Sequence, residues 1–261
     1  MAVLHGERRG RVLVLTIDDP TTRNALGPDI YEAGAEALRR AGEDPGIGAV
    51  VLTGAGATFS SGGNLNRLAG LRDGTPEAVR AGIQGLHGFV QAIRTCSKPV
   101  IAAVEGGAAG AGFSLMLACD LVVAARGARF VLAYVKVGLS PDGGATAFLA
   151  QTLPRQLAAE LAMEGGVVEA ERLHQAGIVN ALCEPGAALD TALARAGTLA
   201  TGPGEAIASI KRLLDAAYAG GLDAQLDCER DSFVANLFHA DAGEGIAAFR
   251  EKRPAAFGGV G

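Results

Sequence analysis

SSGGNL at residues 60–65 and GGAAGAG at residues 106–112 are two glycine-rich stretches that organise this chain of 261 residues. Each follows an apolar segment typical of a buried strand, at 49–53 and at 99–104, and each precedes residues that can open a helix. Glycine leaves the backbone uncovered, and the first N–H groups of a helix have no acceptor within that helix. Two such joints that face each other can hold one oxygen anion between two amides, so the pair predicts an oxyanion hole.

The order of strand, joint and helix recurs along much of the chain. Residues 11–17 are β-branched and apolar and end at an Asp-Asp-Pro turn, which is typical of a strand. From Pro28 to about residue 42, apolar side chains recur at helical spacing. Further helices are predicted at 76–95 and 113–119, and a further strand at 120–125. This alternation predicts an α/β fold.

The second part of the chain has a different composition. From about Leu157 onward it is rich in alanine, leucine and glutamate, which favours helices, and glycine or proline interrupts it at several joints. We place a domain boundary near residue 200. Residues 1–200 are expected to form the core with the active site, and residues 201–261 a helical region.

Composition and charge argue against several classes of function. Apolar residues make up 49% of the chain and charged residues 20%, which is enough for a sizeable core. The net charge of −5 and the lack of a Lys/Arg cluster argue against a nucleic-acid partner. The sequence shows no signal peptide and no apolar run of membrane-spanning length, so we expect no membrane partner. The four cysteines and four histidines are scattered, which favours a cytoplasmic protein with reduced thiols and no metal site.

Several segments together resemble the crotonase (enoyl-CoA hydratase/isomerase) superfamily. The resemblance covers nearly the whole chain, in order, and is carried by residues 24–26 (NAL), 59–65 (FSSGGNL), 98–112 (KPVIAAVEGGAAGAG), 119–120 (CD), 130–144 and 249–254 (FREKRP). It implies the ClpP/crotonase-like α/β fold, a spiral core of ββα units followed by a C-terminal helical region for oligomerisation. It also implies a homotrimer or hexamer that acts on acyl-CoA esters, with coenzyme A as part of the substrate and no separate cofactor.

The resemblance assigns the two amides of the oxyanion hole to the backbone N–H groups of Gly63 and Ala111. Loss of a proton turns a thioester into an enolate, and two nearby amides stabilise the charge that develops on its oxygen. Further contacts with the CoA ester are implied for Ala25, Leu26, Ser61, Asn64, Leu65, Gly110, Ser114 and Tyr134, although local hydrogen bonding is favoured for Asn64. Lys252 and Phe257 are expected either to reach the CoA of a neighbouring subunit or to belong to a solvated tail.

The residues that choose the reaction differ from those of the family's hydratases. Hydratases place and activate a water with two glutamates, and this chain has Ser114 and Tyr134 at those positions. A hydroxyl and a phenol are poor bases at neutral pH. The segment GLSPDGG at residues 138–144 instead resembles that of family isomerases, including ring-1,2-epoxyphenylacetyl-CoA isomerase-like members, whose aspartate moves a proton between carbons. The resemblance makes Asp142 the expected base, and the alternative is a turn residue or a helix cap.

The expected function is therefore an enoyl-CoA isomerase that shifts a double bond or rearranges a ring. A hydratase on the same fold and an acyl-CoA binding protein without catalysis are the two alternatives. A second aspartate that follows a glycine-rich segment, Asp120, is expected to anchor a loop or cap the backbone rather than to act as a base.

Overall fold

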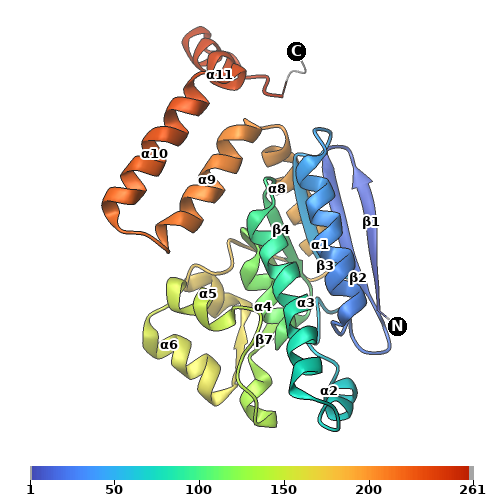
Figure 1. Ribbon diagram of the computed structural model, residues 1–261. Coiled ribbons are helices and arrows are strands. Elements are labelled where there is room, and N and C mark those ends of the chain that lie inside the picture. Colours follow the sequence, from blue (N-terminus) through green and yellow to red (C-terminus); the bar gives the residue numbers. More distant parts are fainter. Residues whose placement is uncertain (1, 259–261) are drawn as a thin grey trace.

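A six-stranded sheet forms the centre of the computed structural model, which describes residues 2–258 (Figure 1). Its strands lie in the order β1 (Val3–Arg9), β2 (Val12–Asp18), β3 (Ala49–Gly54), β4 (Val100–Val104), β6 (Leu121–Ala125) and β9 (Ala181–Cys183). β1 and β2 are antiparallel, and every other neighbouring pair is parallel. β3 and β4 are almost completely buried, because helices cover both faces of this part of the sheet.

Two helices pack side by side over one face, and a third covers the other. On the first face, α1 (Pro28–Glu43) packs against α3 (Pro76–Thr95). A Cβ added at Gly34 of α1 would lie 2.4 Å from the ring of Phe89, so this close approach needs glycine. On the second face, α8 (Ala188–Ala200) buries four alanines at a spacing of one turn, Ala188, Ala192, Ala196 and Ala200. The apolar core therefore has two parts, one on each face of the sheet.

A smaller sheet contains three short strands, with β7 (Arg129–Val131) between β5 (Gly107–Ala109) and β8 (Val167–Glu169). Each glycine-rich stretch leads into a short helix, α2 (Leu65–Leu71) after the first and α4 (Ala111–Ala118) after the second. The other elements before α8 are a 3-10 helix (Ala133–Val137), α5 (Ala145–Thr152), α6 (Arg155–Ala159), a π-helical segment (Glu160–Glu164) and α7 (Ala170–Gln175). The glycine-rich stretch 106–112 therefore contains β5 of the second sheet and follows β4 of the first.

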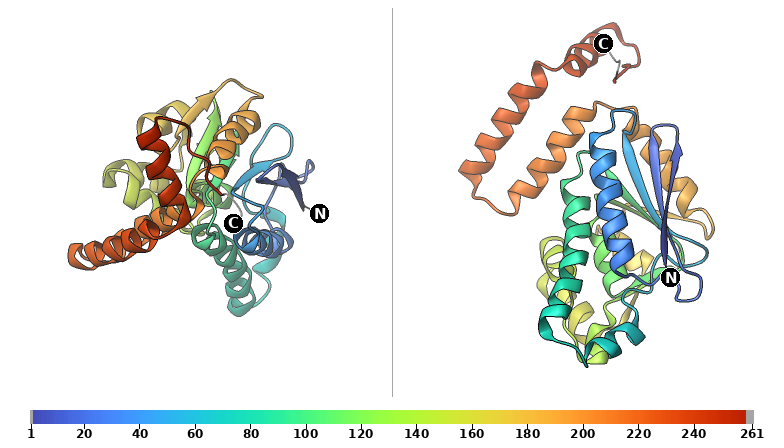
Figure 2. Two further views of the ribbon diagram at one scale, coloured as in Figure 1. Left: turned by 90° about the horizontal axis from the view of Figure 1, so that it is seen from above. Right: turned by 45° about the vertical axis from the view of Figure 1, so that its right-hand side comes forward.

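Three helices after Ala200 form an arm, which consists of α9 (Gly204–Ala217), α10 (Leu222–Leu237) and α11 (Ala240–Glu251). α10 extends away from the sheet in both views of Figure 2. α9 is attached to the body through Lys211, which pairs with Asp120, and through Asp215, which pairs with Arg94. Within residues 2–258, no helix combines the length and the apolar character needed to cross a membrane.

The strands and helices expected from the sequence are present, and five further strands are added. β1 was not expected, because most of its side chains are exposed and several are polar. β5, β7, β8 and β9 span three residues each, which is too short for a hydrophobic period to show. The expectation of helices alone beyond Leu157 is therefore wrong at β8 and β9.

Candidate active site

The two glycine-rich stretches lie against each other. Ala108 of β5 pairs with Ser60, and the Ala109 N–H donates to the Ser60 carbonyl at 2.9 Å. Gly62 has a φ of +83°, and a Cβ added there would lie 2.4 Å from Ala109 O and 3.1 Å from Ala111 N. Only glycine allows two backbone segments to come this close in this conformation. The two joints therefore meet, as the sequence predicts.

The N–H groups of Gly63 and Ala111 do not donate to another protein group within residues 2–258. Ala111 is the first residue of α4, and a hydrogen bond at the start of this helix runs from Ser114 N to Gly110 O, at 3.0 Å. The Ala111 amide is thus one of the unpaired donors that the start of a helix leaves. The Gly110 N–H is already used, because it donates to Val131 O at 2.9 Å. Both predicted amides are therefore available to an oxygen of a ligand.

Asn24 holds a third segment against this pair. Its side chain is buried, with Oδ1 accepting from Asp19 N at 2.9 Å and Nδ2 donating to Ala55 O at 2.9 Å and to Thr58 O at 2.7 Å. Its φ of +61° is one that asparagine tolerates. The chain then turns so that Leu26 N donates to Gly62 O at 2.8 Å, which places Ala25 and Leu26 beside the glycines. The sequence analysis assigned roles to Ala25 and Leu26 but missed the supporting role of Asn24. The available signal for this role is that asparagine is one of the few residues suited to a left-handed turn.

Two polar residues of the first stretch are used by the protein itself. The Ser61 hydroxyl donates to Thr22 O at 2.7 Å. Asn64 caps α2, because its Oδ1 accepts from Asn66 N at 3.0 Å and from Arg67 N at 3.2 Å. This is the local hydrogen bonding expected for Asn64. Leu65 is 61% exposed at the start of the same helix, and its contact with a CoA ester stays a prediction, as does that of Ser61.

Asp142 lies beside the start of α4, together with Ser114 and Tyr134. Tyr134 Oη donates to Asp142 Oδ1 at 2.6 Å. Ser114 Oγ lies 3.3 Å from Tyr134 Oη and 3.3 Å from Gly110 O. A Cβ added at Gly143 would lie 3.0 Å from the Ser114 side chain, so the loop after Asp142 passes close to the helix. The structure thus brings Gly110, Ser114, Tyr134 and Asp142 together, as the sequence predicted.

The surroundings of Asp142 contain buried phenols. Burial first, and then the charge of Asp142, raise the pKa of Tyr134, so this residue keeps its proton and acts as the hydrogen-bond donor. The same two causes raise the pKa of Tyr31 of α1, while the charge of Arg67 opposes the rise. Arg67 has no carboxylate partner within residues 2–258. Tyr31 and Arg67 were not singled out from the sequence, because they come from α1 and α2, which meet only in the fold.

Three other residues lie outside this cluster. Asp120 accepts from Val100 N at 2.8 Å and from Lys211 Nζ at 2.7 Å, which confirms that it anchors the backbone. Lys252 ends α11, and Phe257 packs near Gly245 of the same helix, so both lie on the arm. In the described part of the chain, no group of three or more His, Cys, Asp or Glu side chains is arranged to hold a metal ion.

Comparisons with known proteins match the whole chain. A family model described as enoyl-CoA hydratase/isomerase matches residues 7–260. The 1,2-epoxyphenylacetyl-CoA isomerase of Escherichia coli is 36% identical over 249 residues, which are 95% of each chain. The 2,3-dehydroadipyl-CoA hydratase of the same organism is 34% identical over 265 residues, which cover 99% of this chain and 100% of that protein.

Solved structures share the fold. The crystal structure of an enoyl-CoA hydratase from a Polaromonas species matches with a TM-score of 0.96 and 53% sequence identity, and it covers 97% of this chain and 99% of that chain. The match confirms the α/β crotonase fold expected from the sequence. The names of these similar proteins include both isomerases and hydratases.

Proposed function

Because the chain belongs to the enoyl-CoA hydratase/isomerase family, we propose that it is an enoyl-CoA isomerase, which shifts a double bond or rearranges a ring in an acyl-CoA ester. One observation carries the choice of isomerase. Asp142 is the carboxylate held beside the start of α4, while a serine and a tyrosine occupy the positions of the two hydratase glutamates. A double-bond shift needs one group that removes a proton and returns it elsewhere.

In the proposed mechanism, the thioester oxygen accepts hydrogen bonds from the amides of Gly63 and Ala111. Asp142 removes a proton from the α- or γ-carbon, and the electrons of that C–H bond move onto the thioester oxygen. The two amides and the positive end of the α4 dipole stabilise this enolate. Asp142 then returns the proton to another carbon as the enolate collapses, so the product is an isomer of the substrate. No cofactor beyond the CoA of the substrate enters the proposal.

The hydratase alternative is weaker on this geometry. The resemblance places Ser114 and Tyr134 where the family's hydratases have the two glutamates that place and activate a water. The raised pKa of Tyr134 keeps its phenol protonated at neutral pH, so it cannot act as the base that activates water. The alternative stays in view because similar proteins are named hydratases. An acyl-CoA binding protein without catalysis is a further alternative, since both glutamates are absent.

The test is to incubate the protein with a panel of enoyl-, dienoyl- and aryl-CoA esters in heavy water and to locate deuterium in the products. We expect a product with a moved double bond or a rearranged ring, and deuterium at the carbons that exchange protons with the base. A 3-hydroxyacyl product would favour the hydratase. Tight binding of the esters with neither turnover nor exchange would favour the binding protein.

Gly62→Ala is expected to lower kcat by roughly 10²–10³-fold, the usual effect of losing one oxyanion donor. The added methyl group would press on Ala109 O and Ala111 N and so displace the amide of Ala111. Gly56→Ala is the matched control, since Gly56 has a φ of +71° but nothing within 4 Å of its Cβ. The Gly56→Ala variant adds only the cost of a left-handed backbone at an alanine, which is about 1–2 kcal/mol. Equal kcat in the two variants would contradict the assignment of Ala111.

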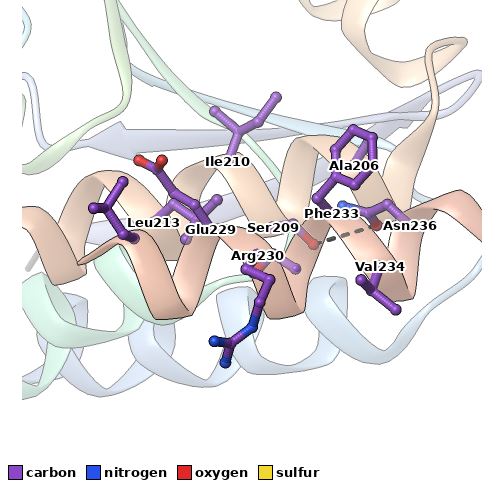
Figure 3. A pocket seen from close by; sticks show the side chains of 11 residues that line it. Ala206, Ser209, Ile210, Leu213, Glu229, Arg230, Phe233, Val234 and Asn236 are labelled. Carbon is purple, nitrogen blue, oxygen red and sulfur yellow. Dashed lines mark hydrogen bonds between the residues drawn. The ribbon is translucent and has the colours of Figure 1, made fainter. Parts of the chain in front are cut away.

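We also propose that residues 201–261 assemble the chain into a homotrimer or hexamer in the cytoplasm, with Lys252 and Phe257 reaching the CoA of a neighbouring copy. A groove of about 620 Å³ lies between α9 and α10, and Figure 3 labels Ile210, Leu213 and Phe233 among the side chains that line it. Phe233 is 68% exposed and lies among other exposed apolar side chains of α9 and α10, Ile210, Leu214 and Leu226, and a contiguous apolar patch of this kind is typical of an interaction site. Sedimentation measures the number of copies, and a mass of 26.3 kDa would contradict the proposal.

A further inference from the structure

The hydrogen bond between Tyr134 and Asp142 gives the two carboxylate oxygens of Asp142 different surroundings. Oδ1 accepts from Tyr134 Oη at 2.6 Å, a distance typical of a strong bond to a charged acceptor. Oδ2 accepts no hydrogen bond from another protein group within residues 2–258. One oxygen is therefore held by the protein, and the other is open to a substrate.

The position of Tyr134 is itself fixed by its surroundings. It lies in the 3-10 helix Ala133–Val137, and its carbonyl accepts from Leu139 N at 3.0 Å, which closes the turn that leads to Asp142. Its ring lies over the start of α4, where a Cβ added at Gly110 would lie 3.9 Å from Cζ. Ser114 Oγ, from the next turn of α4, lies 3.3 Å from the phenol oxygen. The hydroxyl is thus held between α4 and the loop that carries Asp142.

The charges around this pair favour one arrangement of the proton. Tyr134 keeps its proton, because burial and the nearby carboxylate raise its pKa. The other titratable or charged groups that act on this region are Tyr31 of α1, which is also protonated because its pKa is raised, and Arg67 of α2. Ser114 of α4 is neutral. The hydrogen bond therefore runs from a neutral phenol to the Oδ1 atom of Asp142, and it holds that oxygen in place.

We propose that Tyr134 is a positioning residue, which holds Oδ1 of Asp142 so that Oδ2 alone exchanges protons with the acyl chain. This inference rests on the proposed isomerase function. In the forward step, the C–H bond of the substrate breaks, its proton bonds to Oδ2, and its electrons move to the thioester oxygen. Tyr134 keeps its own proton throughout. A base confined to one oxygen meets both carbons from one direction, which suits a proton that leaves one carbon and returns to another.

Tyr134→Phe tests the inference, because it removes only the hydroxyl. We expect kcat to fall about 10–100-fold with KM within about twofold of the native value, in line with the loss of a hydrogen bond to a charged group. The split between kcat and KM is the readout, since a role of the hydroxyl in ester binding alone would raise KM and leave kcat unchanged. Tyr218→Phe is the matched control. It removes a phenol hydroxyl at the end of α9, outside this site, and it should leave kcat and KM unchanged.

A readout without turnover separates this inference from the proposed function. The carboxylate stretching bands that disappear from the infrared spectrum in Asp142→Asn report the hydrogen bonding of this carboxylate. In Tyr134→Phe the separation of these bands should change, because Oδ1 has lost its donor. Unchanged bands, or changed bands with native kcat, would overturn the positioning role. Native isomerisation by Asp142→Asn would instead overturn the proposed function, whatever the tyrosine variant does.

Discussion

Replacing Asp142 with asparagine is expected to lower kcat for isomerisation by roughly 10²–10⁴-fold, the range over which a general base contributes. Asparagine has the same shape, and its oxygen can still accept the hydrogen bond that Tyr134 makes at 2.6 Å. Its amide cannot take a proton from carbon at neutral pH. The amides of Gly63 and Ala111 are untouched, so the affinity for an acyl-CoA ester should stay within about twofold. Steady-state kinetics give kcat, and calorimetric titration with a non-reactive acyl-CoA gives the affinity.

The control for this variant is Asp190→Asn, the same chemical change at an exposed position of α8, on the opposite face of the sheet. It should leave both kcat and the affinity unchanged. The two variants together separate the loss of the base from the loss of one negative charge. Isomerisation at the native rate in Asp142→Asn, with unchanged affinity, would remove Asp142 from the mechanism. Residues 138–144 would then form a turn that shapes the pocket.

The sequence predicts the main parts of this site because each part is local. Glycine is needed at residue 62 by a left-handed turn and a backbone contact, and both leave a signal in the sequence as a run of small residues. The two strands that lead into the joints, β3 and β4, are continuous apolar runs, which are typical of buried strands. The identity of Asp142 came from the resemblance of its segment to family isomerases, and its place beside α4 agrees with that.

The remaining features depend on contacts between distant segments. Asn24 bonds to Ala55 and Thr58, which lie 31 and 34 residues away, and no local pattern encodes such a pair. The hydrogen bond from Tyr134 to Asp142 depends on the turn between them, so the sequence suggested the residues but could not give the geometry. The pair of Lys211 and Asp120 joins positions 91 residues apart. The sequence marked Asp120 as an anchor without showing what it anchors.

Replacing Lys211 with methionine is expected to lower the free energy of unfolding by about 3–5 kcal/mol, the usual cost of removing one partner of a buried ion pair. Lys211 is only 6% exposed, and its Nζ donates to Asp120 Oδ2 at 2.7 Å, Ile93 O at 2.7 Å and Lys98 O at 3.3 Å. Methionine fills similar space but donates nothing, so a carboxylate and two carbonyls lose a partner. Urea unfolding followed by circular dichroism measures the loss.

The loss should depend on pH in a defined direction. Burial raises the pKa of Asp120, and the charge and hydrogen bond of Lys211 oppose that rise. Without Lys211, the pKa of Asp120 in the folded protein lies further above its value in the unfolded chain. The folded state then binds more protons than the unfolded state between the two pKa values, so stability falls as pH rises through that interval. The variant should therefore lose more stability at neutral pH than at acid pH.

Two further variants identify the cause of the loss. Lys136→Met makes the same change at an exposed position and should leave the free energy of unfolding within about 0.5 kcal/mol of the native value. Lys211→Met combined with Asp120→Asn removes the uncompensated charge, while asparagine keeps an acceptor for the Val100 N–H, which lies 2.8 Å from the carboxylate. The double variant should regain part of the stability and lose the pH dependence. If it is no more stable than Lys211→Met, the cause is lost packing of α9 against the ends of α3 and α4 rather than a buried charge.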